Sequence, residues 1–272
     1  MLTTIQDIRQ GIRELGLGGL PLCVHSSLRS FGRVEGGPQA VIDGLRQEGC
    51  TVMVPAFSGG YRVPCPPHLQ PPRNGRDYAA GVTPTAGLER IYTPESNEVD
   101  TYRMGVVPEA LLRYPERRRG NHAICSFAAV GPLADALVRD QAPLDVFAPY
   151  KALARLGGWV VLMGVWLDRL TLLHLAEQLA GRNLFRFCAN DRHGQPAPLE
   201  GGGCSAGFVK MAPLLEPLLR QTTVGASLWR ALPARETLEI AAAAIRRDPQ
   251  ITHCGNPACR SCNDAIAGGP IL

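Results

Sequence analysis

Residues 20–57 read LPLCVHSSLRSFGRVEGGPQAVIDGLRQEGCTVMVPAF, and this stretch decides the fold class. The apolar runs at 20–25 and 51–57 are typical of buried strands. Between them, residues 38–47 have the spacing of an amphipathic helix, with Pro38 well placed in its first turn. Strand, helix and strand in this order form a crossover unit with parallel strands, so the sequence predicts an α/β protein.

The segments on either side extend this pattern. Apolar residues at helical spacing predict a helix over 5–15, which Thr3 or Thr4 can cap and Gly16 can end. A short strand is predicted at 126–131, and the most apolar strand of the chain at 159–166. Further helices are predicted over 104–113, 171–181 and 235–247. Residues 58–85 are rich in glycine and proline and are expected to form a long functional or mobile loop.

The 272 residues are 45% hydrophobic, so 1–272 can form a single domain with a substantial core. The formal net charge of +4 is small for this length, and the arginine-rich run at 116–119 is expected to be a solvated loop. We therefore expect no nucleic-acid partner. No apolar run is long enough to span a bilayer, and Asp7 and Arg9 interrupt any leader-like segment. A cytoplasmic protein without membrane contact is expected, either a monomer or a homodimer.

Nine cysteines in a chain of this kind are not expected to form a disulfide framework. Five of them stand singly in the sequence, and each is predicted to be a buried structural thiol. These five are Cys23, Cys50, Cys65, Cys125 and Cys188.

The remaining cysteines indicate a metal site. The sequence at 253–262, HCGNPACRSC, holds three cysteines in the pattern C-x4-C-x2-C, and structural zinc commonly takes four cysteines or three cysteines and one histidine. Cys204 or His253 could supply the fourth ligand. Cys204 is favoured because adjacent residues rarely bind one ion together, and a distant ligand would tie the tail at 250–272 to the body. The alternative is three reduced thiols in a short helical tail. The predicted zinc ligands are Cys204, Cys254, Cys259 and Cys262.

A candidate catalytic pair lies in TLLHLAE at 171–177, just after the most apolar strand. His174 and Glu177 are three residues apart and would share one face of a helix, close to the strand end where open α/β sheets place their sites. A neighbouring carboxylate holds an imidazole in one tautomer, which suits the imidazole to take a proton from an amine or hydroxyl. The alternative is a helix-surface pair without chemical consequence.

Six segments, in order along roughly residues 5–210, resemble the aminoglycoside 3-N-acetyltransferase family. They are VHSSLRSFG at 24–32 followed by Gly36-Gly37 and the helix at 38–47, TVMVPAF at 51–57, MGVVPE at 104–109, HAICSFAAVG at 122–131, DRLTLLHLAE at 168–177, and Gly203-Cys204 with Gly207-Phe208. The resemblance implies the antibiotic NAT fold, which is unrelated to the common GNAT acetyltransferases. That fold is α/β, with a central mixed, largely parallel sheet flanked by helices and a smaller added subdomain.

The resemblance also implies direct transfer of acetyl from acetyl-CoA to an amine, typically the 3-amino group of an aminoglycoside antibiotic. Antibiotic resistance is the usual result of that reaction, but membership of the family does not by itself imply it, because other relatives acetylate other amines. His174 matches the family's catalytic histidine and Glu177 its partner acid. The turn at Ser26, Ser27 and Leu28 matches the segment that lies against CoA, and its backbone N–H groups could stabilise an oxyanion. Turn residues with only local hydrogen bonds are the alternative.

Acceptor binding is expected to need carboxylates, because aminoglycosides are polycations. The candidates are Glu98, Asp100 and Glu109, with a solvated loop face as the alternative account of the first two. Two other functions stay open at this point. One is an acyltransferase of the same family that acts on a non-aminoglycoside amine metabolite, and the other is a catalytically idle member whose tail zinc site supports protein contacts.

Overall fold

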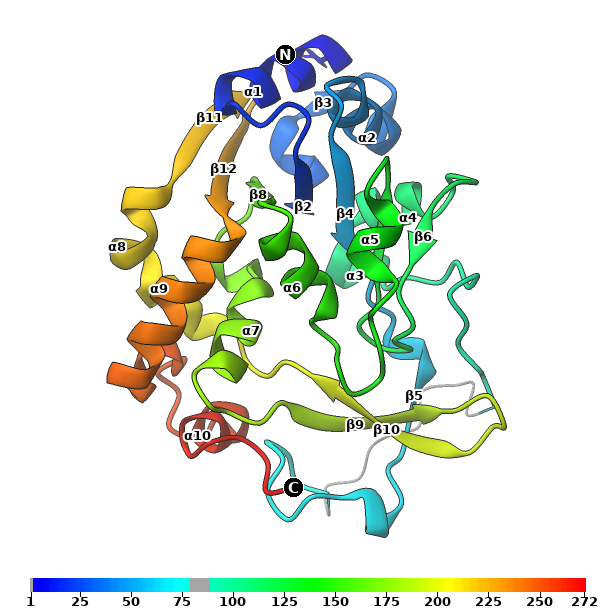
Figure 1. Cartoon of the computed structure of the whole chain (residues 1–272), viewed down its shortest axis with the longest axis vertical. Helices are drawn as coiled ribbons and strands as arrows, with labels where there is room; N and C mark the ends of the chain where they lie inside the picture. The colour runs from blue at the N-terminus through cyan, green and yellow to red at the C-terminus, as the bar shows by residue number, and fades with distance from the viewer. Residues whose placement is uncertain (1, 79–88) are drawn as a thin grey trace.

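The computed structural model describes residues 2–78 and 89–272 (Figure 1). Its centre is a seven-stranded sheet. In order across the sheet, the strands are β11 (Arg220–Val224), β12 (Ser227–Pro233), β8 (Trp159–Met163), β2 (Pro21–Ser26), β4 (Thr51–Pro55), β7 (Phe127–Val130) and β6 (Arg118–Arg119). The pairs β8–β2 and β2–β4 are parallel and the other pairs antiparallel. The predicted central mixed sheet is confirmed, and its parallel pairs lie at its centre.

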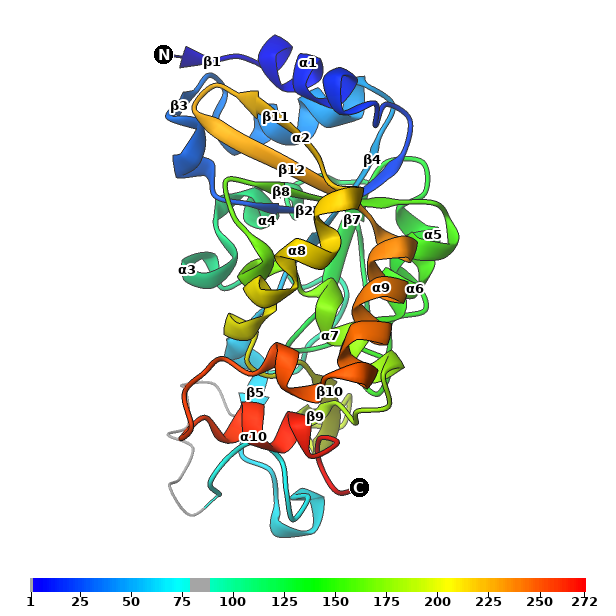
Figure 2. The same cartoon turned by 90° about the vertical axis from the view of Figure 1, so that its left-hand side faces the viewer.

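Helices cover both faces of this sheet. The longer ones are α1 (Ile5–Leu15), α2 (Gly37–Gln47), α6 (Ala148–Arg155), α7 (Leu172–Leu179) and α9 (Ala234–Arg247). The shorter ones are α3 (Thr101–Met104), α4 (Val106–Leu111), α5 (Ala134–Val138), α8 (Ala212–Leu215) and α10 (Arg260–Ile266). A two-residue pair, β1 (Leu2–Thr3) and β3 (Arg33–Val34), lies beside α1 near the N-terminus (Figure 2).

Successive residues of the central strands enter two separate cores. Leu22 and Val24 pack with α1, α2 and α4, whereas Cys23 between them packs with α5, α6, α7 and α9. In β8, Val161 belongs to the first core and Val160 to the second. This alternation follows from the two-residue period of a strand. A strand buried on both faces reads as a continuous apolar run, which is why these strands were visible in the sequence.

The crossover unit that was expected at 20–57 is present. The strand β2 pairs in parallel with β4 through the register Pro21↔Thr51, with α2 between them in the chain. The helix α1 also agrees with its predicted ends, because Thr4 forms a capping box with Asp7 and Gly16 closes the helix in the left-handed conformation.

The helix predicted over 104–113 is present as α4 but begins later, at Val106. Gly105 adopts φ 79° and ψ −176°, a conformation open only to glycine, and the chain forms two short helices, α3 and α4, on either side of it. The strand predicted at 159–166 also ends early, at Met163, because Gly164 turns the chain with φ 67°.

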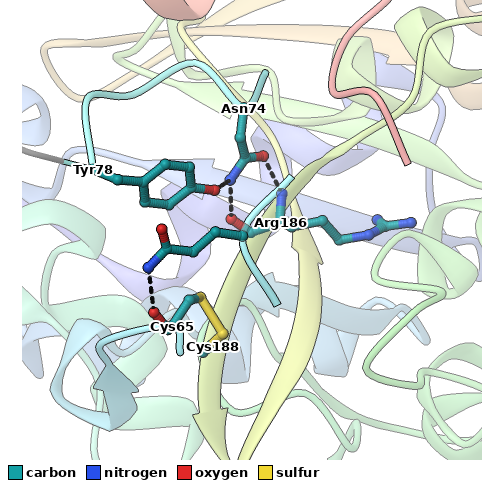
Figure 3. Close-up of a disulfide and its surroundings, with 6 residues drawn as sticks. Cys65, Asn74, Tyr78, Arg186 and Cys188 are labelled. Carbon is teal, nitrogen blue, oxygen red and sulfur yellow. Dashed lines mark hydrogen bonds between the residues drawn. A yellow bond between two sulfur atoms is a disulfide. The ribbon is translucent and has the colours of Figure 1, made fainter. Parts of the chain in front are cut away.

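A second, three-stranded antiparallel sheet forms the smaller unit at the lower end of Figure 1. Its strands are β10 (Pro196–Gly201), β9 (Phe185–Asn190) and β5 (Arg62–Val63). The loop expected over 58–85 supplies β5, while its residues 79–85 lie outside the described part of the chain. Asn74 ties this loop to β9, since its side chain donates to the Arg186 carbonyl and accepts from the Arg186 N–H, each at 2.7 Å (Figure 3).

Cys65 and Cys188 form a disulfide between this loop and β9 (Figure 3). The prediction that each is a lone buried thiol is wrong. The register Val63↔Cys188 brings the two segments side by side, and the two cysteines are 123 residues apart in sequence, so no local spacing signals the pair. Cys23 and Cys50 are buried free thiols, as predicted, and Cys125 is a free thiol that is partly exposed.

The expectation of a solvated loop at 116–119 is wrong for Arg119. Its guanidinium is buried and donates to the carbonyl groups of Ala56 and Glu98, both at 2.8 Å. Arg119 therefore fixes the segment before α3 against the main sheet.

Among the described residues, no helix combines the length and the apolar character that crossing a bilayer requires.

Two buried histidines make the stability of the fold depend on pH. Burial lowers the pKa of His25 to about 4 and that of His122 to about 4. Both nitrogens of His122 are engaged, since Nε2 lies 2.9 Å from the Glu200 carbonyl and Nδ1 accepts from the Cys125 N–H. The pKa of a histidine in the unfolded chain is about 6.5, so between about pH 4 and pH 6.5 the unfolded chain binds protons at these two histidines and the folded chain does not.

The stability from these two groups is therefore complete above about pH 6.5 and is lost as the pH falls towards 4. Each of the two histidines should lower the free energy of unfolding by about 2 kcal/mol when the pH falls from 7 to 5. Urea unfolding at the two pH values measures this loss, and His122→Gln should show a smaller difference than the unaltered protein. Equal unfolding free energies at pH 7 and pH 5 would contradict the prediction.

Candidate active site

The predicted pair of His174 and Glu177 is in direct contact on α7. Nδ1 of His174 lies 2.8 Å from Oε2 of Glu177, and both side chains are buried. The helix follows β8 after a short connecting turn, so the pair lies beyond the carboxyl end of a central parallel strand. This is the position at which open α/β sheets place their sites.

The pair continues to a third residue that sequence spacing did not indicate. Arg182 donates from Nη1 to Oε1 of Glu177 at 2.6 Å and to the Thr252 hydroxyl at 2.7 Å, and from Nη2 to the Pro249 carbonyl at 2.6 Å. The guanidinium is permanently charged, so the buried carboxylate has a fixed cationic partner on the side away from the imidazole. His174, Glu177 and Arg182 form one hydrogen-bonded chain.

This chain fixes the tautomer of His174. An ionised carboxylate only accepts hydrogen bonds, so Nδ1 of His174 carries the proton and donates it to Glu177. The lone pair of the neutral ring is then on Nε2, which makes no hydrogen bond with the described residues. Nε2 is therefore the atom that is able to take a proton.

Three residues enclose the imidazole. Phe147 lies parallel to the ring with 6.3 Å between centroids, and Phe208 meets it edge-on at 4.8 Å. Gly202 completes the enclosure, because a Cβ placed on it would lie 2.4 Å from Cδ2 of His174. The ring is held by contacts on several sides in addition to its hydrogen bond.

The turn predicted to face CoA lies where β2 ends beside β8. Ser26 pairs with Met163 in the sheet, and the N–H of Ser27 donates to the Met163 carbonyl at 2.9 Å. The Ser27 carbonyl accepts from Ser30. The N–H of Ser27 is thus engaged inside the protein, whereas the hydroxyls of Ser26 and Ser27 and the N–H of Leu28 make no hydrogen bond with the described residues.

The three predicted acceptor carboxylates already have cationic partners. Glu98 pairs with Arg90 at 2.5 Å and accepts a hydrogen bond from Tyr61. Asp100 caps α3, and its carboxylate lies 3.6 Å from the Arg103 guanidinium. Glu109 pairs with Arg113 at 3.1 Å, within a surface hollow that three further arginines also line. These three carboxylates do not form an unpaired acidic cluster.

The four predicted zinc ligands come together. The sulfur atoms of Cys204, Cys254, Cys259 and Cys262 all lie within 4.8 Å of one another. His253, the rival fourth ligand, is engaged elsewhere, since Nε2 lies 3.0 Å from Oδ1 of Asn263 and Nδ1 accepts from the Gly255 N–H at 3.0 Å.

Sequence reasoning missed the residues that hold His174 and Glu177. Arg182 and Thr252 are 70 residues apart, and neither belongs to a local pattern. Phe147 lies outside the six segments on which the family resemblance rests. The run Gly201-Gly202-Gly203 was the one available signal, since consecutive glycines indicate a backbone that other groups approach closely.

Comparison with known proteins gives consistent matches. The family described as aminoglycoside 3-N-acetyltransferase matches residues 23–246. Aminoglycoside N(3)-acetyltransferase VIII of Streptomyces fradiae is 37% identical over 195 residues, covering 70% of this chain and 65% of the relative. Aminoglycoside N(3)-acetyltransferase IV of a Salmonella species is 31% identical over 253 residues, covering 87% and 86%. The match to the Streptomyces relative therefore spans less than two thirds of that protein's length.

Solved structures agree in fold over nearly the whole chain. The apoenzyme of aminoglycoside acetyltransferase AAC(3)-IVa superposes with a TM-score of 0.79 at 26% identity, covering 98% of each chain. A mutant of the same protein in complex with a gentamicin superposes with a TM-score of 0.77, again at 26% identity and 98% coverage.

Proposed function

The chain belongs to the aminoglycoside 3-N-acetyltransferase family, and we propose that it transfers acetyl from acetyl-CoA to the 3-amino group of an aminoglycoside. The observation that carries the proposal is the hydrogen-bonded chain of His174, Glu177 and Arg182, in which Nε2 of His174 makes no hydrogen bond with the described residues. Relatives of this chain are named for this reaction, and the solved structure of a gentamicin complex has the same fold.

In this proposal His174 is the general base. An ammonium has no lone pair, so the acceptor nitrogen must be unprotonated to attack the thioester carbonyl. As the C–N bond forms, Nε2 of His174 takes the proton that the nitrogen loses. The tetrahedral intermediate then breaks its C–S bond, and the imidazolium returns the proton to the leaving CoA sulfur. The products are an N-acetylated amine and CoASH, and His174 is neutral again.

Glu177 and Arg182 act on the base and do not touch the substrate. When His174 gains a proton, the Glu177 carboxylate 2.8 Å away stabilises the new positive charge. Arg182 holds that carboxylate in place through its second oxygen. Both are positioning residues, because each acts through its neighbour in the hydrogen-bonded chain.

Acetyl-CoA is proposed to lie along the turn at Ser26–Leu28. The free hydroxyls of Ser26 and Ser27 and the N–H of Leu28 can donate to a phosphate or to the oxyanion. Ser27 contributes its hydroxyl and not its N–H, which is engaged with Met163.

The charge distribution favours one second candidate, an acyltransferase for an amine other than an aminoglycoside. Each of Glu98, Asp100 and Glu109 is paired with an arginine, so binding a polycation there requires breaking ion pairs. Within the described part of the chain, Nε of Arg62 and Nε of Arg76 are buried without a hydrogen-bond partner. Both guanidinium groups stack on Phe187, at 4.3 and 4.5 Å from the ring centroid. An acceptor that carries an anionic group would suit such a pair.

Thiol release from acetyl-CoA across 4,6- and 4,5-disubstituted aminoglycosides tests the proposal, with NMR of the product to locate the acetyl group. Turnover with acetylation at the 3-amino group is the expected result. Binding of CoA without turnover of any aminoglycoside would favour the second candidate. A protein that binds no CoA would be a catalytically idle family member.

A further inference from the structure

We propose that Cys204, Cys254, Cys259 and Cys262 bind one structural zinc ion, and that this ion holds in place the two segments that enclose and orient His174. The site joins the loop after β10 to the tail after α9. The proposal that the cysteines bind zinc does not depend on the reaction. The proposal that the ion orients His174 rests on the proposed function of His174.

The arrangement of the sulfur atoms fits tetrahedral zinc. With Zn–S bonds of about 2.3 Å, the sulfurs of such a site are about 3.8 Å apart. The four sulfurs here lie within 4.8 Å of one another, so small shifts would bring them to this spacing. The N–H of Cys254 already donates to the sulfur of Cys262 at 3.4 Å, as expected of a site built to hold thiolates. Four protein ligands leave no open position, so the ion would be structural.

One zinc-bound segment leads directly to the imidazole. Cys204 lies two residues after Gly202, which is so close to the His174 ring that an added Cβ would lie 2.4 Å from Cδ2. Four residues further on, Phe208 is fully buried and packs against the ring at 4.8 Å between centroids. Between them, the Ser205 hydroxyl donates to the Asp168 carbonyl at 2.7 Å, just before α7. Binding of Cys204 to zinc would therefore hold in place Gly202 and Phe208, the two residues of this loop that contact His174.

The other zinc-bound segment leads to the carboxylate end of the same chain. Thr252 and Pro249, which hold Arg182, precede Cys254 by two and five residues. The two segments also touch, because a Cβ on Gly207 would lie 2.2 Å from the Thr252 carbonyl oxygen. Figures 1 and 2 both show α10 beside the small sheet, at the end of the tail that leads out of α9. The ion would hold these two segments together at positions where neither segment belongs to a sheet.

Metal analysis of the purified, untagged chain tests the first part, with zinc released by a mercurial reagent and measured with a metallochromic dye. One zinc per chain is expected. Cys254→Ser and Cys262→Ser should each lose nearly all of it. Cys50→Ser is the matched control, because Cys50 lies outside the cluster and its thiol donates to the Leu17 carbonyl, as a hydroxyl also can. A chain without zinc, whether its four cysteines are free thiols or disulfides, would overturn the proposal.

The second part is tested by NMR of the histidine side chains, before and after zinc removal under reducing conditions. The signal that disappears in His174→Ala identifies His174. We expect this signal to shift or broaden on zinc removal and to return when zinc is added back. The signal of His193, in an exposed turn, should not change. A zinc-bound chain whose His174 signal is unaffected by zinc removal would refute the positioning role. Neither measurement uses acetyl transfer, so failure here is distinct from failure of the proposed reaction.

Discussion

His174→Ala is expected to lower kcat for acetyl transfer by a factor of about 10² to 10⁴, the usual contribution of a general base. No described residue forms a hydrogen bond with Nε2 of His174, so no neighbouring group is in place to act as the base when His174 is removed. The fold should persist, because Glu177 keeps its ion pair with Arg182 at 2.6 Å and is not left as an unpaired buried charge. Thiol release from acetyl-CoA under saturating conditions measures the effect.

Two controls separate lost chemistry from lost structure. Calorimetric binding of CoA should remain within a few fold of the unaltered protein, because the proposed CoA contacts at Ser26–Leu28 are on a different element. His193→Ala removes a histidine from an exposed turn and should leave turnover unchanged. Near-normal turnover by His174→Ala would show that His174 is not the general base.

Gly202→Ala is expected to reduce kcat by about 10², although residue 202 carries no chemical group. The added methyl group would lie 2.4 Å from Cδ2 and 2.7 Å from Nε2 of His174. The ring has little room to yield, because Glu177 holds Nδ1 and Phe147 and Phe208 pack against its other sides. Displacement of the imidazole misplaces the base relative to the acceptor nitrogen.

Steady-state kinetics and thermal unfolding check this prediction together. KM for acetyl-CoA should change little, and the overpacked site should lower the free energy of unfolding by about 1 to 3 kcal/mol. Gly18→Ala is the matched control, since Gly18 is exposed and a Cβ there meets only the Glu48 carbonyl, at 3.6 Å. Unchanged kcat in Gly202→Ala would mean that the imidazole can move without loss of catalysis, and would remove the argument for close confinement.

Local patterns predicted the parts of the fold that depend on local physics. Both termini of α1 follow from Thr4 and Gly16, and the contact of His174 with Glu177 follows from helical spacing. The parallel centre of the sheet follows from the strand–helix–strand order at 20–57. Each of these features involves residues that are near one another in sequence.

Features that depend on distant pairing were not predictable in this way. Arg182 meets Thr252 across 70 residues, and Cys65 meets Cys188 across 123. The strands β9, β10 and β11 also went unpredicted, although the resemblance implied a smaller added subdomain. The strand β11 is mostly polar, and two prolines in β10 weaken its strand pattern. The four cysteines of the proposed zinc site are the exception, since the C-x4-C-x2-C spacing indicates a site and structural zinc needs a fourth ligand from elsewhere in the chain.

The central position of β2 has a consequence for synthesis of the chain on the ribosome. One edge of β2 pairs with β4, which is made soon afterwards, but the other pairs with β8, where Leu22 meets Trp159. At about 5 to 20 residues per second, that edge stays open for on the order of 10 s of translation. An open strand edge rich in apolar side chains invites pairing with other nascent chains. Shielding of the emerging N-terminal half by a chaperone should therefore raise the yield of this protein more than stabilisation of the finished fold.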